Sequence, residues 1–537
     1  MTDLPPQLSA LLEEQGVDAS RSHRVLAALA DGGWWSARDL VRSTAVAHRL
    51  VERILDALGP DLEHDGQRVR LRDAAGYTVF DRPLPADPVA HLAGRHPRAA
   101  AELRRLVAQA PESRIDLDHV AATADTALRR GLFLATRFHL PGARLLCVGD
   151  HDLTSLAATL VEPRLEAVVV DVDERMLDYI DSAAARLDLR VRCYFADLRL
   201  GLPAAVRGRA DLVFTDPPYT PEGVELFLRR GLEGLASPGD GRTLLAYGAS
   251  ETTPALVART QARLTRLNLA TEAIWPDFNR YLGAEGIGAA SDLYVLRATS
   301  RTPVGTDERE AARIYSQGSN AKEARGGLAP DAAGDLLERV DADLVVGAWP
   351  SADRDLPRAR LSTWFASPVS AHRALVDLTG GWEHLAGRAI LAGRAPELHV
   401  AVPSASADVR DQAGQEALRR LVAPLYDLRF LRGVPDPRHT VILARRRSDR
   451  PDDTPGQRLL RHCQERAHGS VASALREGLI RVAADLGRSI NKKTARTSVA
   501  AAAPWLSGHT LLDLPLHRLE RLGEVTDLLT ADLCTPG

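Results

Sequence analysis

Cysteine is rare in this chain, and long apolar runs are missing. The four cysteines stand at scattered positions, Cys147, Cys193, Cys463 and Cys534. Because they show no paired spacing, the sequence argues against a zinc site and against a secreted disulfide framework, and we expect no metal. No stretch approaches the roughly 20 apolar residues of a membrane span. The sequence therefore predicts a soluble, cytoplasmic protein.

Lysine is almost absent as well, with three Lys against 65 Arg. The formal net charge is −3, so composition gives no electrostatic case for nucleic acid or an anionic membrane as a partner. What the chain does have is length. Its 537 residues, 45% of them hydrophobic, exceed one core and predict three or four domains.

The most regular pattern lies between residues 143 and 299. Five apolar runs, separated by helical or shorter intervals, end in a polar residue or a glycine: ARLLCVGD (143–150), EAVVVD (166–171), VRCYFAD (191–197), ADLVFTD (210–216) and GRTLLAYG (241–248). This alternation predicts an α/β fold with a doubly wound, mostly parallel sheet. Two late runs, 269–278 and 291–299, add a strand pair. The order is similar to the methyltransferase-like Rossmann fold.

Acids gather where these predicted strands end. Ligands of such sheets lie at the carboxyl ends of the strands. Asp171, about twenty residues past the first strand, suits a pair of ribose hydroxyls, and Asp197 suits an exocyclic adenine amine. Alternatively, Asp150 or Asp152 only caps the following helix. The expected cofactor-binding set is Gly149, Asp150, Asp171, Asp173, Asp197 and Pro217.

The fourth strand ends in the tetrapeptide Asp216-Pro217-Pro218-Tyr219. A similar turn in amino-methyltransferases holds the target amine by its acceptors, with the aromatic ring against the substrate. Two prolines stiffen the turn and remove backbone donors, so that acceptors dominate. This suits any amine nucleophile, although a merely rigid turn is the alternative.

Several motifs together resemble one family. They are IDLDHVAATADTALRR (115–130), GDHDLTS (149–155), DVDER (171–175), ADLR (196–199), DPPYTPEGVELFLRRGLEGL (216–235) and DFNRYL (277–282). In this order they resemble the branched-chain polyamine synthases, the N4-bis(aminopropyl)spermidine synthases, over roughly residues 21–299. The resemblance implies a transferase that moves an aminopropyl group from decarboxylated S-adenosylmethionine to a polyamine amine and releases methylthioadenosine. It also leads us to expect a homo-oligomer such as a dimer.

The acids fit this chemistry. Donor and acceptor are both cations, and burying them requires nearby carboxylates. A polyamine nitrogen has a pKa of about 10, so the nucleophile must lose a proton, and we expect Asp152 to accept it, with Asp216 next. The expected catalytic residues are thus Asp152, Asp216 and Tyr219. The expected substrate-binding residues are Asp118, His151, Asn279 and Tyr281.

Two histidines depart from the family pattern. His151 stands where the family has the middle acid of GDDD, and His119 follows Asp118 where the family has Gln. Replacing an acid by an imidazole removes negative charge from the pocket, which implies either a less cationic amine acceptor or a tuned proton path. The other reading is that His151 points away and packs.

The first 80 residues show three helical segments and a hairpin with Asp65-Gly66 at its turn, which predicts a winged-helix domain. Its presumed recognition helix, 45–58, mixes Arg49 and Arg53 with Glu52 and Asp56. Such a face favours a subunit-contact or lid role over binding to nucleic acid. Residues 81–140 are expected to form a helical connection to the catalytic domain at 141–300.

Beyond residue 300 the resemblance ends. Residues 301–334 read as a linker. Residues 335–450 repeat the order strand, helix, strand, strand of the first sheet, which predicts a degenerate methyltransferase-like region without a second active site. Residues 451–537 have a helical pattern. A chain ending near Arg301 is therefore expected to retain some transfer chemistry.

Two other functions remain open. The chain could be an amino-methyltransferase that uses intact S-adenosylmethionine and the same DPPY turn, for which a basic groove would speak. It could also be a polyamine-sensing, DNA-binding regulator on an inactive enzyme scaffold, although the presence of Asp152, Asp216 and Tyr219 argues against this.

Overall fold

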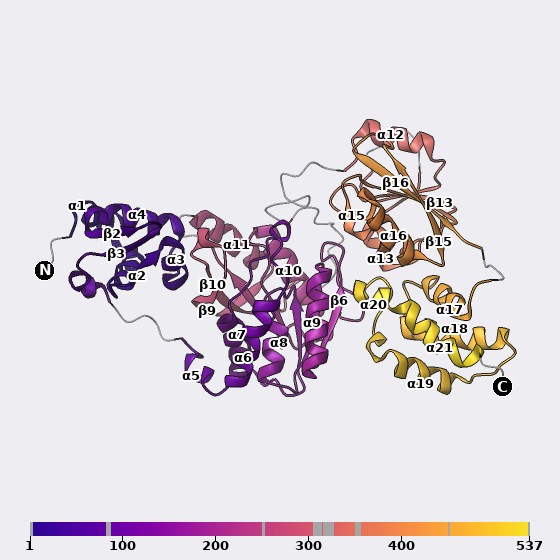
Figure 1. Ribbon diagram of the computed structural model, residues 1–537, viewed down its shortest axis with the longest axis horizontal. Helices are drawn as coiled ribbons and strands as arrows, with labels where there is room; N and C mark the ends of the chain where they lie inside the picture. The colour runs from indigo at the N-terminus through magenta and orange to yellow at the C-terminus, as the bar shows by residue number, and fades with distance from the viewer. Residues whose placement is uncertain are drawn as a thin grey trace.

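The computed structural model describes residues 4–81, 87–249, 253–303, 314, 327–349, 356–448 and 452–534. Three sheets and a carboxyl-terminal group of helices organise these residues. The small sheet lies at one end of the molecule and the seven-stranded sheet in the middle, while the six-stranded sheet and the carboxyl-terminal helices lie side by side at the other end (Figure 1). We call them the N-terminal unit (4–81), the first α/β unit (87–303), the second α/β unit (327–448) and the C-terminal helices (452–534). Most of the predicted linker 301–334 lies outside the described residues.

The N-terminal unit packs four helices against a small antiparallel sheet of order β1-β3-β2. Its elements are α1 (Pro6–Gln15), α2 (Ala19–Leu29), β1 (Trp35–Ser36), α3 (Ala37–Thr44), α4 (His48–Leu58), β2 (Leu62–Asp65) and β3 (Arg68–Leu71). The β2–β3 hairpin turns at Asp65-Gly66, as predicted. A core of its own holds the unit together, formed largely by aliphatic side chains of α2, α3 and α4.

Helices lead into the first α/β unit. They are α5 (Ala90–Ala93), α6 (Pro97–Gln109) and α7 (Ala124–Arg137). The side chain of Thr123 accepts a hydrogen bond from the backbone N–H of Thr126 and so caps α7. This cap fixes the start of the helix that carries Arg130 toward the sheet.

The first α/β unit contains a seven-stranded sheet of order β6-β5-β4-β7-β8-β10-β9. Its strands are β4 (Arg144–Val148), β5 (Glu166–Asp171), β6 (Val191–Phe195), β7 (Leu212–Thr215), β8 (Arg242–Tyr247), β9 (Leu269–Arg280) and β10 (Ala290–Ala298). The first five are parallel, and β10 runs antiparallel to β8 and β9. All five predicted runs are strands because each buries an apolar stretch between helix layers. The strand order reverses between β4 and β7, which makes their carboxyl ends the expected ligand site.

Four helices connect these strands: α8 (Thr154–Val161), α9 (Glu174–Leu187), α10 (Pro221–Gly234) and α11 (Pro254–Arg266). Each begins close to the end of a strand, so the motifs at 149–155, 171–175 and 216–221 are strand-to-helix turns. The predicted α/β alternation is thus confirmed for this part of the chain.

The second α/β unit contains a six-stranded sheet of order β12-β11-β13-β14-β16-β15. Its strands are β11 (Leu344–Val346), β12 (Arg358–Ala359), β13 (Arg373–Asp377), β14 (Glu397–Pro403), β15 (Tyr426–Arg432) and β16 (His439–Arg446), with helices α12 (Pro330–Arg339), α13 (Leu361–Ala366), α14 (Ala386–Ala392), α15 (Ala407–Arg410) and α16 (Gln412–Val422). The series β11-β13-β14-β16-β15 repeats the order β4-β7-β8-β10-β9, again with the last two strands antiparallel. The repeated order predicted from sequence is therefore present.

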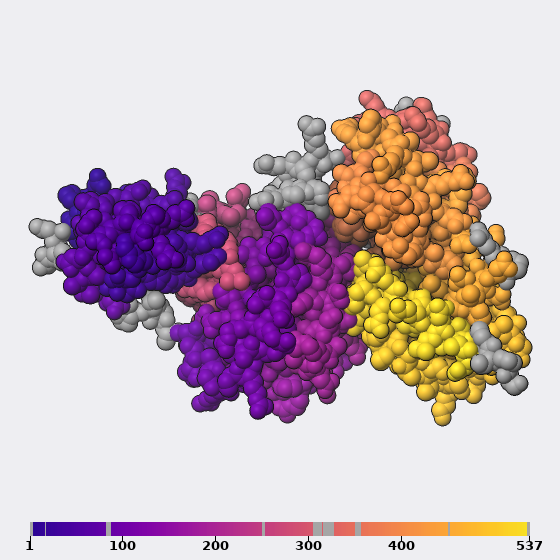
Figure 2. Space-filling model, in the orientation of Figure 1, coloured from indigo at the N-terminus to yellow at the C-terminus, as the bar shows by residue number. Residues whose placement is uncertain are grey.

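The C-terminal helices are α17 (Pro455–Gln464), α18 (Val471–Asp485), α19 (Lys492–Ala502), α20 (Leu516–Glu520) and α21 (Leu522–Cys534). They lie beside the second α/β unit and reach β6 and α9 of the first (Figures 1 and 2). Among the described residues, no helix is both long and apolar enough to cross a membrane.

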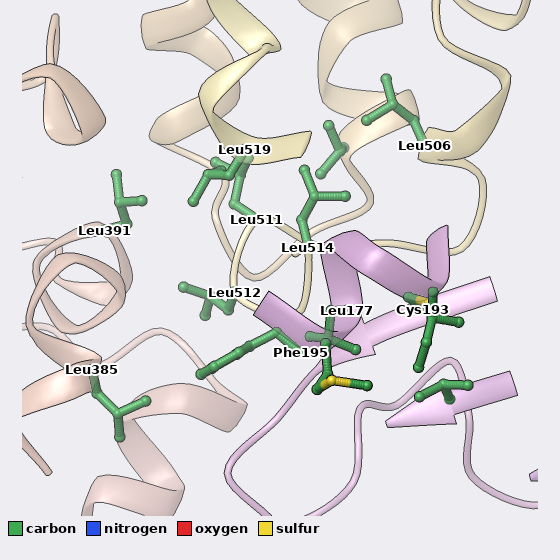
Figure 3. Packing of buried hydrophobic residues seen from close by; sticks show 14 of the residues in the cluster. Leu177, Cys193, Phe195, Leu385, Leu391, Leu506, Leu511, Leu512, Leu514 and Leu519 are labelled. Atoms are coloured by element: carbon green, nitrogen blue, oxygen red, sulfur yellow. The ribbon is translucent and has the colours of Figure 1, made fainter. Parts of the chain in front are cut away.

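One apolar core joins these last three parts. Leu177, Cys193 and Phe195 of the first unit, Leu385 and Leu391 of the second, and five leucines between 506 and 519 converge in Figure 3. The backbone N–H of Phe195 at the end of β6 also donates to the carbonyl of Asp513, 2.8 Å away. The first α/β unit is therefore not an isolated body with the rest of the chain merely attached.

Candidate active site

The loop after β4 is built around Gly149 and Asp150. Gly149 has a φ of +72°, and a Cβ there would lie 3.3 Å from the ring of Phe227. The Asp150 carboxylate accepts the backbone N–H groups of Thr154 (2.8 Å) and Ser155 (3.1 Å). Asp150 is thus the cap of α8, the alternative left open by the sequence. Burial raises its pKa to about 7 against the opposing effect of these hydrogen bonds.

The acids after β5 also accept hydrogen bonds from backbone N–H groups. Asp171 accepts the N–H groups of Asp150 (3.0 Å) and Asp173 (2.9 Å), which ties the β4 and β5 loops together. Asp173 caps α9 and pairs with Arg175 at 2.7 Å. Asp171 faces a small cavity of about 30 Å³, the position expected for a ribose-binding acid, whereas Asp173 serves the turn.

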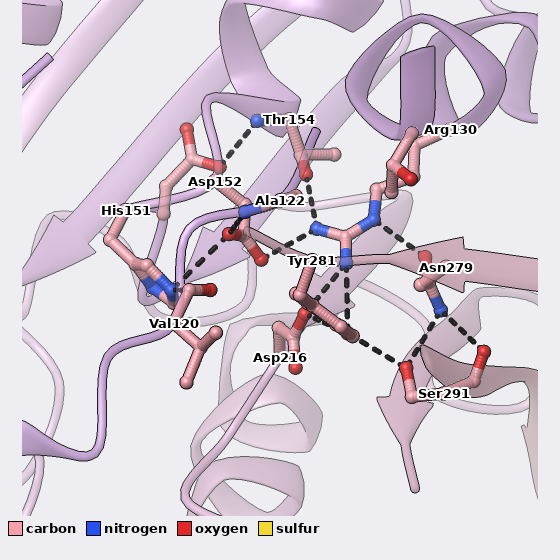
Figure 4. A network of polar contacts seen from close by, with 12 residues as sticks. Val120, Ala122, Arg130, His151, Asp152, Thr154, Asp216, Asn279, Tyr281 and Ser291 are labelled. Carbon is pink, nitrogen blue, oxygen red and sulfur yellow. Dashed lines mark hydrogen bonds and ion pairs between the residues drawn. The ribbon is translucent and has the colours of Figure 1, made fainter. Parts of the chain in front are cut away.

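A buried arginine that the sequence analysis did not single out lies at the centre of the site (Figure 4). Arg130, from α7, is 1% exposed. Its guanidinium donates to Asp152 (2.8 Å), Asp216 (2.6 Å) and the Asn279 side chain (2.8 Å). One cation thereby joins the strand ends of β4 and β7 to β9, and it compensates two buried carboxylates.

The carboxylates of Asp152 and Asp216 differ in their partners and in whether they line a cavity. Asp152 accepts from Arg130 with one oxygen and from the N–H of Ala122 (2.8 Å) with the other, which also lies 3.2 Å from Nε2 of His151. Burial alone would raise the pKa of Asp152, but His151 and Arg130 outweigh it and hold the pKa well below its usual range. Asp152 lines none of the cavities described at this sheet edge. The geometry therefore counts against its predicted role as the proton acceptor.

Of the two carboxyls, Asp216 has the higher pKa. Burial and the neighbouring Asp152 carboxylate raise its pKa to about 7. Its oxygens accept from Tyr219 (3.0 Å) and Tyr281 (2.8 Å), which also contact each other at 2.9 Å. Asp216, Tyr219 and Tyr281 all line a cavity of about 350 Å³, together with Asp118, His119, His151 and Pro217. Of Asp152 and Asp216, the carboxyl that lines this cavity is thus the one whose pKa is raised.

The two histidines stack. The rings of His119 and His151 are 4.4 Å apart and parallel to within 1°. Burial by itself would lower the pKa of His151, but the carboxylates of Asp152 and Asp216 outweigh it and raise the pKa. Burial, reinforced by His151, lowers the pKa of His119 to about 2. Of the two rings, His151 is therefore the more basic, and both rings line the cavity rather than pointing away.

Asn279 and Asp197 are both held by other side chains, although Asp197 still lines a cavity at this sheet edge. Asn279 is fully buried; its amide donates to Ser291 while its oxygen accepts from Arg130, so it positions the arginine instead of facing the cavity. Asp197 is closed off by Arg199 (2.5 Å) and by His384 of the second α/β unit (3.2 Å). These partners hold the pKa of Asp197 well below its usual range in spite of burial.

Three cavities follow one another along this sheet edge. The cavity of about 350 Å³ shares Asp118, His119, His151 and Asp216 with the small cavity of about 30 Å³. That small cavity in turn shares Leu117 and Val172 with a third, of about 300 Å³, beside Asp197. Within the described ranges, no group of three or more His, Cys, Asp or Glu side chains is placed to hold a metal ion.

Comparison with known proteins finds a similarity over this part of the chain. Residues 99–310, which span α7, the seven-stranded sheet and every motif of the site, match the family model of the branched-chain polyamine synthase A C-terminal domain. This segment is similar to the branched-chain polyamine synthases. The predicted resemblance is confirmed over these residues, and the second α/β unit and C-terminal helices lie beyond the match.

Individual relatives also show this similarity. The chain is 32% identical to the N(4)-bis(aminopropyl)spermidine synthase of Thermus thermophilus over 189 residues, 35% of this chain and 50% of that protein. It is 35% identical to an uncharacterized protein of Methanocaldococcus jannaschii over 185 residues, 34% of this chain and 46% of that protein. The chain thus spans about half the length of the curated relatives it matches. Among solved structures, the Thermus thermophilus branched-chain polyamine synthase with N4-aminopropylspermidine and 5'-methylthioadenosine matches at a TM-score of 0.43 and 22% identity, over 58% of this chain and 97% of that one.

Proposed function

We propose that this protein transfers an aminopropyl group from decarboxylated S-adenosylmethionine to an amine of a polyamine-like acceptor. The match over residues 99–310 supports this proposal. The observation that carries it is the buried Asp216 carboxyl, which faces the cavity between two tyrosine hydroxyls and has a pKa of about 7. Carboxylates in such a cavity suit cationic reactants.

In this proposal Asp216 receives the proton of the acceptor nitrogen. The freed electron pair attacks the carbon next to sulfur, the C–S bond breaks, and its electrons remain on sulfur as the neutral thioether methylthioadenosine. With a pKa of about 7, the Asp216 carboxyl differs from an alkylammonium, whose pKa is about 10, by roughly three pH units. An ordinary carboxyl would differ by more. Asp152 is then a positioning residue that holds Arg130 and His151, and Tyr219 and Tyr281 orient Asp216.

The charge of the stacked histidines affects which amine can bind as the acceptor of the aminopropyl group. When His151 is protonated, it adds a second cation to Arg130 beside the Asp152 and Asp216 carboxylates. A second positive substrate nitrogen near His151 would be repelled. We therefore propose an acceptor with fewer charged nitrogens at this end than spermidine has, which is the first of the two alternatives raised by the sequence.

The N-terminal unit is proposed to be a winged-helix domain that shapes the acceptor side. Arg24 pairs with Asp277 at 2.7 Å, and Arg38 pairs with Glu285 at 2.9 Å. Segment 282–288 carries Ala284 and Ile287 into the lining of the 350 Å³ cavity. In the presumed recognition helix, Arg53 pairs with Glu14 at 2.7 Å within the unit. These contacts favour a lid or positioning role over binding to DNA.

We further propose that the four parts correspond to the domains predicted from sequence, with the last three packed through their shared core, and that the protein is a cytoplasmic homo-oligomer. Light scattering of the purified full chain gives the oligomeric state directly, and a monomer at micromolar concentration would contradict this part of the proposal.

The reaction itself is tested by product mass. The full chain is incubated with a panel of polyamines and either decarboxylated or intact S-adenosylmethionine. We expect an aminopropyl increment and methylthioadenosine from the decarboxylated donor, because the acids of the site disfavour a donor carboxylate. A methylated product from the intact donor would support the amino-methyltransferase alternative instead.

A further inference from the structure

The cavity of about 300 Å³ lies between two units of the chain. Five of its eleven lining residues, Glu383, His384, Ser406, Ala407 and Asp408, come from the second α/β unit, and the others come from the first. The family match ends at residue 310. Half of this cavity is therefore made by a part of the chain that the matched family segment does not contain.

Its position along the sheet edge indicates what it would hold. In a doubly wound sheet the acid about twenty residues past the first strand contacts the ribose, and here that acid is Asp171, in the small middle cavity. The adenine base of the donor then lies on the side of the ribose that is away from the reacting centre. Leu117 and Val172 form the boundary between the middle cavity and the 300 Å³ cavity, which is where the base would enter.

Asp197, the acid that we predicted to contact the base, already has partners within the chain. The oxygens of Asp197 accept from the Arg199 backbone N–H (3.0 Å), from its guanidinium and from His384. The Arg199 guanidinium is itself fixed by the Gly381 carbonyl (3.0 Å) and by the ring of Trp382, 3.8 Å below it. Asp197 is thus engaged in joining the two units.

The second unit does offer acceptors. Glu383 Oε2 is buried and has no hydrogen-bond partner in the described part of the chain. No described residue donates to the Asp408 carboxylate, whose pKa is raised to about 6 by burial although His384 opposes this. Both side chains line the cavity, and the exocyclic amine of adenine is a donor that needs such an acceptor.

We propose that Asp408 and Glu383 of the second α/β unit bind the exocyclic amine of the donor's adenine, so that the donor site is completed by the unit outside the family match. This inference rests on the proposed function. The second unit then makes the donor site selective for a 6-aminopurine. His384 positions this part of the second unit against Asp197.

The test uses the full chain and two nucleosides, 5'-methylthioadenosine and 5'-methylthioinosine, which differ by an amine against a carbonyl on the base. Calorimetry should show that the unaltered protein prefers methylthioadenosine. Asp408→Asn and Glu383→Gln should each weaken methylthioadenosine binding by about tenfold or more, the worth of a hydrogen bond to a charged group. Asp408→Asn should also shift the preference toward methylthioinosine, because its amide can donate to the carbonyl.

Glu416→Gln is the matched control, since Glu416 lies on the exposed face of α16 in the same unit. It should bind both nucleosides like the unaltered protein. A change in preference distinguishes recognition from a folding defect, which would weaken both nucleosides together. If both variants melt cooperatively and keep the original affinity and preference, the inference is wrong while the proposed function stands. If the unaltered protein binds neither methylthioadenosine nor decarboxylated S-adenosylmethionine, the proposed function fails and this inference with it.

Discussion

At the residue scale, the site depends on how Arg130 divides its charge between two acids. Asp152 receives a charged hydrogen bond from the arginine, a contact with His151 and a backbone hydrogen bond, whereas Asp216 faces the cavity and shares its oxygens with two tyrosines. The pKa values move apart because burial and the Asp152 carboxylate raise that of Asp216, whereas His151 and Arg130 outweigh burial and lower that of Asp152. Two neighbouring carboxyls with opposite shifts are the usual arrangement when one is structural and the other exchanges a proton.

Replacing Asp216 by Asn should lower turnover by about 10²–10⁴, the usual worth of a positioned general base, while the donor's dissociation constant stays nearly unchanged. Because the active form of Asp216 is deprotonated, kcat/KM of the unaltered protein should rise with pH through about 7, and Asp216→Asn should lose this limb. Steady-state kinetics across pH measure both effects. A preserved limb near pH 7 in the variant would assign that pKa to another group.

Replacing Arg130 by Met should destabilise the protein by about 3–5 kcal/mol, because two buried carboxylates lose their cation. Denaturant unfolding measures the loss. Arg104→Met is the control, since Arg104 is exposed on α6 and its removal should change stability by no more than about 0.5 kcal/mol. Equal stability of the two variants would show that Asp152 and Asp216 are not both charged beside Arg130.

At the element scale, the strand ends were predictable and their partners were not. Apolar runs ending in acids placed β4, β5, β6 and β7 correctly, because a parallel strand buried on both faces must be apolar and its carboxyl end must meet the ligand edge. The sequence also left open that Asp150 caps α8, which it does.

Arg130 was missed because an arginine in a helix normally lies in solvent, and only contacts to residues 152, 216 and 279 reveal its burial. His384 was missed for the same reason, since nothing near it in sequence indicates contact with Asp197.

The loop at 282–288 is the element that couples the N-terminal unit to the acceptor cavity. Gly288 has a φ of +80°, and a Cβ there would lie 2.6 Å from the Ala45 carbonyl oxygen. Gly288→Ala should therefore displace this loop and raise the acceptor KM, by up to about 10²-fold for a misplacement near 1 Å, with donor affinity unchanged. Gly142→Ala is the control, because Gly142 has a φ of +79° with nothing within 4 Å of its would-be Cβ. Equal acceptor KM values in the two variants would contradict a positioning role for the N-terminal unit.

At the scale of the whole molecule, the first α/β unit depends on the parts that follow it. The ring of Phe195 lies 3.6 Å below the Arg388 guanidinium, and Tyr194 stacks on His509 at 4.2 Å. Arg388 also pairs with Glu174 at 2.6 Å. Edge strand β6 and helix α9 are thereby covered by both later parts, as Figures 2 and 3 show. The sequence could not indicate this, because the resemblance ends near residue 300 and suggested a self-sufficient catalytic domain.

A chain ended after residue 303 should consequently melt at a lower temperature than the full chain and bind an apolar dye, since β6 becomes an exposed edge and the core around Phe195 opens to water. Its donor affinity should fall further than its stability explains, because Glu383 and Asp408 are removed with the second unit. Thermal melts and calorimetry with methylthioadenosine measure these effects separately. If the shortened chain melts cooperatively at the temperature of the full chain and turns over at an undiminished rate, the first unit is self-sufficient and the later parts serve some purpose outside the donor site.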